Sequence, residues 1–358
     1  MRTKDLTLQE FHPCSVLVHE EHFPQRSKFP IIDVNNHFGR GQDWTTNIKM
    51  PYPHQNWTIP DLDAGIAIMD ELNIRCAFNL DGGWGEVLQH NLLRYKKPHP
   101  NRFVIFAGVD WTEVDNPDFG EKWAKELEKS VIAGAEGLAV FKTLGLEFRD
   151  RTGQLIMPGD LRLEPIWAKA GELNIPVIIH TADPISFFMK QDETNERWEE
   201  LCENPDWQYY GKNIPPFLRL INSMLSMVER NRNTIFIGAH VLGYSENLKF
   251  VAQALDRYPN LYIDIAERIS ELGRQPYSAR KFLINYSDRI LFGTDTFSPN
   301  RIKYQTYLRF LETEDEYFDY GTNQGRWKIY GLNLPDDTLR KIYFENANSL
   351  FLTKKNHL

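Results

Sequence analysis

Four polar side chains that could do chemistry stand directly after short apolar stretches of the sequence. They are His37, His180, His240 and Asp295. Imidazole and carboxylate groups bind divalent metals and act as general acids and bases. One histidine at a strand end is more often a structural hydrogen-bond partner than a ligand. Four such residues after four apolar stretches point instead to a shared site.

The apolar stretches occur at eight places, and each predicts a β-strand. They cover residues 30–34, 74–78, 102–108, 136–141, 175–179, 234–239, 260–264 and 289–293. Apolar residues predominate in most of them, as expected for parallel strands that are covered on both faces. The intervening segments carry helical spacing, for example at Leu248, Val251 and Leu255.

Eight strands, each followed by a helix, predict an α/β fold of the (β/α)8 barrel type. The carboxyl ends of all strands in such a barrel meet at one mouth, so the four polar residues would converge there. The alternative is an open doubly wound sheet. Gly82-Gly83-Trp84-Gly85 has the wrong spacing for a dinucleotide fingerprint, and no phosphate loop or Gly-x-Ser-x-Gly elbow occurs.

Domain organisation follows from the same pattern. Residues 1–28 are polar and weakly periodic, so we predict an N-terminal arm lying on a barrel domain formed by residues 29–358. Residues 183–215, after the fifth strand, form the longest connection. Long connections are usually functional. We predict either a lid over the mouth, with Arg197 or Trp198 facing the cavity, or an insertion packed on the rim.

Composition restricts the class of partner. The 358 residues carry a net charge of −8, with Lys and Arg scattered, which speaks against a nucleic-acid surface. No apolar stretch approaches the ~20 residues of a membrane span, and no signal peptide is evident. Three distant cysteines suit a reducing compartment, so we expect a cytoplasmic protein. The expected partner is a small-molecule substrate, and the chain could form a homo-oligomer.

The stretch Asp33-Val34-Asn35-Asn36-His37 resembles the Asp-x-His-x-His motif that opens the amidohydrolase superfamily, with Asn35 in place of the first histidine. The stretches 179–184 and 292–295 are similar to segments of the amidohydrolase-related family that includes aminocarboxymuconate-semialdehyde decarboxylase. The resemblance runs from about residue 30 to Asn346-Ala347. It implies that His37, His180 and Asp295 bind a divalent metal, commonly zinc, and that His240 assists catalysis.

Asn35 changes the expected metal site. Three protein ligands and a water suffice for catalytic zinc, and an amide oxygen from Asn35 would be a neutral, harder fourth ligand. Such a site would bind zinc more weakly and tilt toward Mn²⁺ or Mg²⁺. Alternatively the site holds no metal, as in metal-independent lactonases of the family, and Asn35 orients a neighbour. We expect a divalent metal, zinc first.

Lys142 ends the fourth predicted strand, in Leu138-Ala139-Val140-Phe141-Lys142. Binuclear amidohydrolases carry a carboxylated lysine at this place, which bridges two metals. We favour a different role, in which the ammonium group binds a substrate carboxylate or oxyanion. An ion pair with a rim acid such as Glu147 is the structural alternative.

Further substrate-binding candidates are arginines near the mouth. Arg268 and Arg274 follow the seventh predicted strand, and arginine forks suit bidentate carboxylate recognition. Salt bridges to Glu267 and Glu271 on the rim are the alternative role. The complete set of predicted substrate-binding residues is Lys142, Arg197, Trp198, Arg268 and Arg274.

These residues predict a metal-dependent hydrolase that acts on a small carboxylate- or hydroxyl-bearing lactone, ester or amide. The metal would acidify a bound water and polarise the carbonyl. Asp295 would ligate it and accept the water's proton, while His240 would hydrogen-bond the carbonyl oxygen or shuttle a proton. Alternatives are a non-oxidative decarboxylase, a metal-independent lactonase and a non-catalytic ligand-binding barrel. Asn35 alone supports the last, and the retained histidines argue against it.

Overall fold

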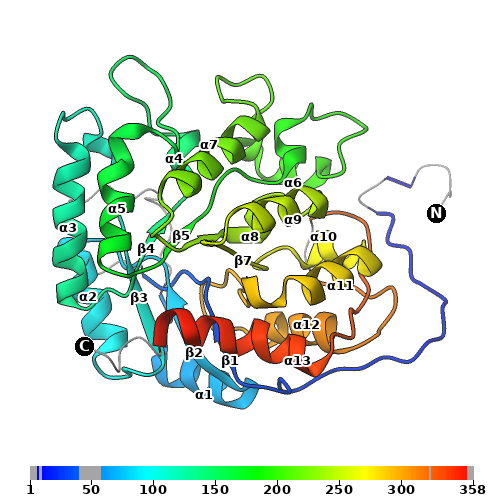
Figure 1. The fold of residues 1–358 in the computed structure, drawn as a ribbon. Helices are drawn as coiled ribbons and strands as arrows, with labels where there is room; N and C mark the ends of the chain where they lie inside the picture. Colours follow the sequence, from blue (N-terminus) through cyan, green and yellow to red (C-terminus); the bar gives the residue numbers. More distant parts are fainter. Residues whose placement is uncertain (1–5, 8–9, 40–57, 322–323, 353–358) are drawn as a thin grey trace.

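The structure, a computed structural model, describes residues 6–7, 10–39, 58–321 and 324–352. Eight parallel strands follow one another in sequence order around a barrel (Figure 1). They are β1 (Ile31–Asp33), β2 (Ile74–Asn79), β3 (Phe103–Ala107), β4 (Gly137–Val140), β5 (Val177–Ile179), β6 (Phe236–Gly238), β7 (Leu261–Asp264) and β8 (Ile290–Leu291). The predicted (β/α)8 barrel is confirmed.

Helices connect and surround the strands (Figure 1). The α-helical segments are α1 (Leu62–Leu72), α2 (Gly85–Asn91), α3 (Phe119–Ala133), α4 (Thr143–Leu146), α5 (Glu164–Glu172), α6 (Trp198–Glu203), α7 (Phe217–Arg230), α8 (Ala239–Leu242), α9 (Leu248–Arg257), α10 (Ile269–Gly273), α11 (Pro276–Asn285), α12 (Arg301–Glu312) and α13 (Asp336–Arg340). Short 3₁₀ and π turns are η1 (Leu92–Lys96), η2 (Trp111–Glu113), η3 (Leu161–Leu163), η4 (Ile185–Phe188), η5 (Pro205–Trp207), η6 (Ser287–Arg289), η7 (Lys341–Glu345) and η8 (Asn348–Leu352). None of the described helices is both long and apolar enough to cross a lipid bilayer.

Alternate residues of each strand enter two apolar layers. Ile32, Val104 and Ile178 belong to a cluster that fills the barrel, which Phe351 from the C-terminal segment joins. Their neighbours along the strands, such as Ile31, pack instead against the helices. This alternation is the two-residue period of a strand. Burial on both sides explains why the strands are apolar throughout.

The barrel closes at a seam between β1 and β8, where the strands themselves are short. Backbone hydrogen bonds continue beyond them: Val34 N–H donates to the Phe292 carbonyl at 3.0 Å, and Asp295 N–H donates to the Asn35 carbonyl at 2.8 Å. His37 N–H donates to the Thr296 carbonyl at 2.9 Å. The seam therefore carries three of the predicted site residues.

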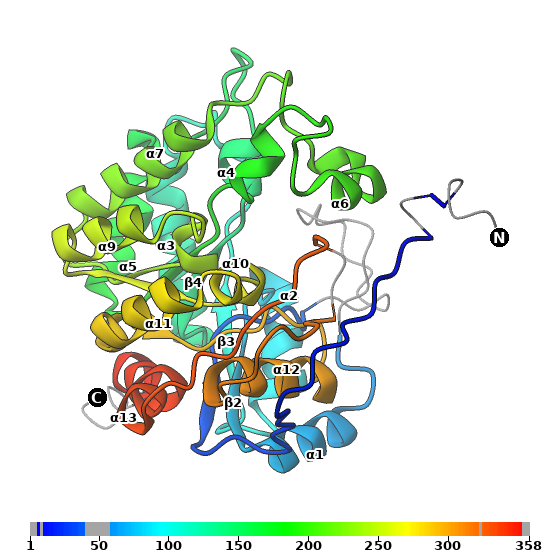
Figure 2. The ribbon, with the colours of Figure 1, turned by 90° about the vertical axis from the view of Figure 1, so that its right-hand side faces the viewer.

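The described residues before β1 form no helix or strand and run along the outside of the barrel, across α12 (Figure 2). Glu21 pairs with Arg309 of α12 at 2.9 Å. The ring Nδ1 of His22 lies 2.6 Å from a carboxylate oxygen of Asp315, whose side chain is fully buried. These contacts attach the arm to α12 and to the segment that follows it.

Candidate active site at the barrel mouth

A cavity of about 670 Å³ opens at the carboxyl ends of the strands. His37, His180, His240 and Asp295 all line it, so the structure brings together the four residues that follow apolar strands. The 183–215 segment also contributes to the lining, with residues that include Phe187, Trp207 and Tyr209. The segment therefore borders the mouth, while a lid-like opening motion stays a prediction.

His37 lies between two carboxylates. Its Nδ1 is 3.0 Å from Asp81 Oδ1, and its Nε2 is 3.1 Å from Asp295 Oδ1. Burial opposes the positive charge, but Asp81 and Asp295 outweigh it and raise the pKa of His37 to about 10. The pKa of Asp295 falls well below its usual range despite burial, because His37 bonds to it. The pair is thus an imidazolium and a carboxylate.

His240 has the opposite charge state. Burial, aided by the nearby positive charge of Arg268, lowers its pKa to about 4, so the ring is neutral. Its Nδ1 lies 2.9 Å from the carbonyl of Ala266, which can only accept, so Nδ1 carries the proton. The unprotonated Nε2 lies 4.0 Å from Asp295 Oδ2. His240 therefore presents a proton acceptor beside Asp295.

The backbone around the mouth is unusual. His240 has a left-handed φ of 58°, and Ala182, Glu267 and Asp295 have φ values of 62°, 51° and 56°. Such conformations cost on the order of 1–3 kcal/mol each for residues other than glycine and cluster at functional sites. The N–H of His240 donates to Asp264 Oδ1 at 2.9 Å, which helps to hold the turn.

His180 stacks edge-on against His240, with ring centroids 4.2 Å apart. Burial and the neighbouring His240 lower its pKa well below the usual range. Its buried Nε2 has no hydrogen-bond partner within the described residues and lies 3.8 Å from Asp183 Oδ1. Buried polar atoms are rarely left without a partner. This nitrogen is therefore available to a ligand.

The side chain of Asn35 is buried and is oriented by one hydrogen bond. Its amide Nδ2 donates to Asp264 Oδ2 at 3.0 Å. The amide oxygen is buried and accepts no hydrogen bond from any described residue. Burial raises the pKa of Asp264 to about 7, opposed by the hydrogen bonds that it accepts. Asp264 thus orients Asn35 and leaves the amide oxygen, a possible metal ligand, unused.

The described side chains at the mouth are of the kinds that bind a divalent metal, but they are not arranged around one metal position. Within the described residues, no group of three or more His, Cys, Asp and Glu side chains is arranged around a metal position. His180 Nε2 and Asn35 Oδ1 are nevertheless buried without hydrogen-bond partners. Together with Asp295, and with His37 once its Nε2 has lost its proton, they supply nitrogen and oxygen donors of the kinds that suit Zn²⁺ or Mn²⁺. The residues therefore fit a divalent metal.

Lys142 lies in the cavity lining and is paired with a different acid from the predicted Glu147. Its Nζ is 2.7 and 2.8 Å from the two oxygens of Asp183. Tyr209 donates to the same carboxylate at 2.7 Å, and the Trp207 ring lies 5.5 Å from Nζ. Lys142 is therefore paired with Asp183 at the edge of the cavity.

Arg197 and Trp198 differ in their position relative to the cavity. Arg197 lines the cavity, but its guanidinium is buried and pairs with Glu271 and, at 2.7 Å, with Glu200. Its charge is therefore satisfied within the protein. Trp198 is 42% exposed and is not among the lining residues.

The two arginines after β7 also differ from each other. Arg268 lines the cavity, whereas Arg274 is not in the lining and forms a bidentate pair with Glu196 at 2.6 and 2.7 Å. The Arg274 guanidinium stacks on the Trp327 ring at 4.1 Å. Neither arginine forms the predicted salt bridge with Glu267 or Glu271. Lys303 pairs with Glu267, and Arg197 pairs with Glu271.

Sequence reasoning gave no role to three acids that the structure places at the site: Asp81, Asp183 and Asp264. Asp264 ends β7, and Asp81 comes two residues after β2. Both therefore follow the strand-end pattern that identified the histidines. Asp183 follows His180 in the loop after β5. These signals were present in the sequence.

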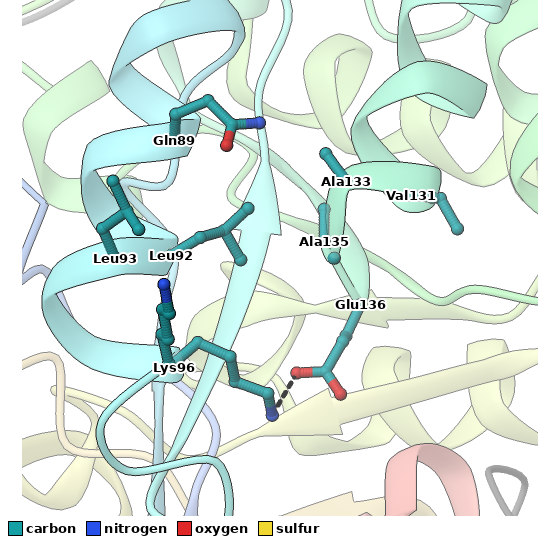
Figure 3. A pocket seen from close by; sticks show the side chains of 10 residues that line it. Gln89, Leu92, Leu93, Lys96, Val131, Ala133, Ala135 and Glu136 are labelled. Carbon is teal, nitrogen blue, oxygen red and sulfur yellow. Dashed lines mark ion pairs between the residues drawn. The ribbon is translucent and has the colours of Figure 1, made fainter.

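A second hollow, of about 520 Å³, lies between η1 and the end of α3 (Figure 3). An ion pair of 2.7 Å joins Lys96 and Glu136 there. Glu136 directly precedes β4, so this hollow is at the amino-terminal face, away from the mouth. Active sites of (β/α)8 barrels lie at the opposite face, where the strands have their carboxyl ends. The mouth therefore remains the candidate site.

The sequence matches a known protein family. A family model described as amidohydrolase matches residues 85–352, well over half of the sequence. The chain belongs to this amidohydrolase family. The matched range includes His180, His240 and Asp295, whereas the Asn35–His37 stretch precedes it. No curated protein matches the sequence significantly.

Solved structures share the fold at low sequence identity. A 2,6-dihydroxybenzoate decarboxylase complexed with 2,6-dihydroxybenzoate is 17% identical, with a TM-score of 0.55 over 90% of this chain and 99% of that chain. A dihydroxybenzoic acid decarboxylase from Polaromonas, with bound manganese and the inhibitor 2-nitroresorcinol, is 17% identical, with a TM-score of 0.58 over 92% and 98%. A probable 2-pyrone-4,6-dicarboxylic acid hydrolase from Acinetobacter baumannii, with citric acid bound, is 12% identical, with a TM-score of 0.50 over 90% and 99%.

Proposed function

We propose that the protein is a non-oxidative decarboxylase of aromatic acids that carry a hydroxyl group beside the carboxylate. The observation that carries this proposal is the neutral His240, whose unprotonated Nε2 faces the cavity beside Asp295. Two of the structures similar in fold are dihydroxybenzoate decarboxylases, which supports this reaction over the hydrolysis predicted from the sequence.

The cavity walls suit a flat ring. Phe141, Phe187, Trp207, Tyr209 and Phe297 all line it. The His37 ring lies 5.5 Å from the Phe141 ring and 5.8 Å from the Phe297 ring, so aromatic surface flanks the reacting groups. Aromatic side chains favour offset or edge-on contacts with another ring. An aromatic substrate can therefore lie between these aromatic side chains and reach Asp295 and His240.

The reaction replaces a carbon–carbon bond with a carbon–hydrogen bond. His240 Nε2 accepts the proton of the ring hydroxyl, which makes the neighbouring ring carbon electron-rich. The resulting imidazolium, stabilised by Asp295, delivers that proton to the carbon that bears the carboxylate. The carbon–carbon bond then breaks, its electron pair restores the aromatic ring, and CO₂ leaves. A proton from water restores the product hydroxyl, so one proton is consumed overall.

His37 and Asp295 position this chemistry. The imidazolium of His37 is held by Asp81 and fixes Asp295 through the 3.1 Å contact, so Asp295 keeps its negative charge near His240. A divalent metal would bind only after His37 loses the proton on Nε2, because an imidazolium has no lone pair to offer. It would then be held by His37, His180 and Asp295, with the amide oxygen of Asn35, and would supply a Lewis acid for the substrate's oxygens. The bound manganese in the Polaromonas structure, which shares the fold, supports the presence of a divalent metal.

The test is CO₂ release from 2,6-dihydroxybenzoate by protein purified with and without added Mn²⁺ or Zn²⁺. We expect CO₂ and resorcinol in equal amounts. The His240→Asn variant should lose this activity, while Trp198→Ala, on the exposed rim, should keep it. Ortho-hydroxylated acids that are all left intact under every metal condition would reject the proposal.

Hydrolysis of a lactone is the second candidate. His240 Nε2 could equally accept a proton from water, and the fold is shared with the probable 2-pyrone-4,6-dicarboxylic acid hydrolase. A panel of pyrones and lactones separates the two reactions, because hydrolysis opens a ring and releases no CO₂. Ring opening without CO₂ release would favour this candidate over the decarboxylase.

A further inference from the structure

We propose that Arg268 binds a second substrate carboxylate, one that stays in the product. The inference rests on the decarboxylation proposed above and narrows its substrate class. The preferred substrate would be an aromatic dicarboxylic acid that loses the carboxylate beside its hydroxyl group and keeps the other on Arg268.

Arg268 is a buried cation in the wall of the cavity. It lines the same cavity as His240, and only 6% of its surface is exposed. Its guanidinium donates one hydrogen bond, at 2.8 Å, to the carbonyl oxygen of Glu267. Among residues 10–39, 58–321 and 324–352, no carboxylate lies within ion-pair distance of it. Since a guanidinium has five N–H donors, most of them remain available to a ligand.

The other cations of the lining are already engaged. Lys142 pairs with Asp183, and Lys303 pairs with Glu267. Arg197 pairs with two glutamates. Lys212 is exposed and donates to the Asp206 carbonyl at 3.1 Å. Within the described lining, Arg268 is therefore the buried cation that lacks a carboxylate partner.

Longer-range charges explain how an unpaired arginine is tolerated there. Arg268 lies close enough to Glu200, Glu246 and Glu271 to favour their ionised forms against burial. Lys and Arg contribute five side chains to the lining, and Asp and Glu contribute six. A carboxylate on Arg268 gains a direct partner, whereas a further anion would find no free buried cation.

The retained carboxylate is the better partner for chemical reasons. A carboxylate that leaves as CO₂ loses its negative charge in the transition state. A cation bound to that group would stabilise the substrate more than the transition state and would slow the reaction. A carboxylate that stays keeps its charge throughout, so Arg268 can hold it at every step without this penalty.

The test compares two acids that lose the same ortho carboxylate. 4-Hydroxyisophthalate would yield 4-hydroxybenzoate, and salicylate, which lacks the retained carboxylate, would yield phenol. Steady-state rates are measured for wild-type protein, Arg268→Gln, Arg268→Lys and the control Arg257→Gln. Arg257 is on the outer helix α9, is paired with Glu229 and is 63% exposed. Binding of 4-hydroxybenzoate and phenol is measured by calorimetry in the same proteins.

We expect the wild-type protein to prefer 4-hydroxyisophthalate. Arg268→Gln should raise KM for the diacid about 10- to 100-fold, as expected for loss of a charged hydrogen-bonded pair, with a smaller change in kcat. Arg268→Lys should fall between, and salicylate rates should change little. 4-Hydroxybenzoate should bind the wild-type and Arg257→Gln proteins much more tightly than it binds Arg268→Gln.

Equal wild-type preference for the two acids, or an equal loss for both in Arg268→Gln, would overturn the inference. Should neither acid be decarboxylated, the proposed reaction fails by itself, and the calorimetry still decides the role of Arg268. If Arg268→Gln does not fold, Arg268→Lys and the wild-type affinities for 4-hydroxybenzoate and phenol give the same decision.

Discussion

The two sides of the barrel mouth carry histidines with opposite charge. On the β1 and β8 side, His37 touches Asp81 and Asp295 and has a pKa of about 10. On the β5 and β6 side, the His240 side chain is 3% exposed against 12% for His37, has no carboxylate within hydrogen-bond distance, and has a pKa of about 4. Burial opposes the positive charge on both rings, and the carboxylates that touch His37 outweigh it there.

Asp295 lies between the two sides and connects them. Its Oδ1 faces His37 and its Oδ2 faces His240. One side therefore supplies a fixed positive charge, and the other supplies a neutral base. The predictions below alter this contrast, beginning with the largest expected effect.

Asp295→Asn should remove the connection between the two sides and cause the largest loss. The variant removes the anion that would stabilise a protonated His240 and leaves Asp81 as the carboxylate beside His37. We expect kcat/KM for 2,6-dihydroxybenzoate to fall by roughly 10³-fold or more, in the upper range for acid–base groups. Thermal denaturation should confirm a folded variant. Activity within tenfold of wild type would contradict the central role of this carboxylate.

His240→Gln should reduce the rate by about 10²- to 10³-fold, since it removes the proton acceptor but leaves His37 and Asp295 paired. The loss should appear in kcat more than in KM. Lys142→Gln, which alters a charge already matched by Asp183, serves as the comparison and should cost less. A larger effect in Lys142→Gln would show that His240, at the end of β6, is not the base.

Asn35→His should increase zinc affinity by about 10- to 100-fold, the scale of effect that even supporting residues have at metal sites. The new imidazole would add a nitrogen donor beside His37 and His180. Metal content after identical dialysis, measured by mass spectrometry, compares the variant with wild type. No gain in zinc would favour a metal-independent site, in which Asn35 serves to bond Asp264.

Asp81→Asn should have the smallest effect of the four substitutions. It should change how the stability of the metal-free protein depends on pH. The folded pKa of His37, about 10, exceeds its ordinary value of 6.5. The stability that protonated His37 gives to the folded protein is therefore complete below pH 6.5 and is lost as pH rises toward 10. The difference in unfolding free energy between wild type and Asp81→Asn, from urea titrations, should be largest near pH 6.5 and shrink toward pH 10. A difference that grows over this interval would show that His37 is neutral.

The fold could be predicted from the sequence because its signals are local. The apolar stretch 102–108 contains the whole of β3, and the stretch 74–78 matches β2 to within one residue. Convergence of His180, His240 and Asp295 followed from topology, since every strand of a parallel barrel ends at the same mouth.

The partners of charged side chains could not be predicted in the same way. Lys142 pairs with Asp183 rather than with the nearer Glu147, and Arg197 pairs with Glu271, which is 74 positions away. These pairings depend on how the loops after β4, β5 and β7 fold over the mouth. Periodicity carries no information about loop shape, so such pairs require coordinates.

The seam between β1 and β8 links the formation of the site to the end of folding. The contacts from Thr294 to Asp33 span 261 of the 358 residues, so most of the chain must be arranged before they form. Closing so long a loop is entropically costly and is expected late in folding. β8 has only two residues, which leaves few hydrogen bonds to resist reopening there. Amide exchange should therefore be faster at Val34 and Asp295 than in the middle of β5 and β6, so that the first strands to part would also separate His37 from Asp295.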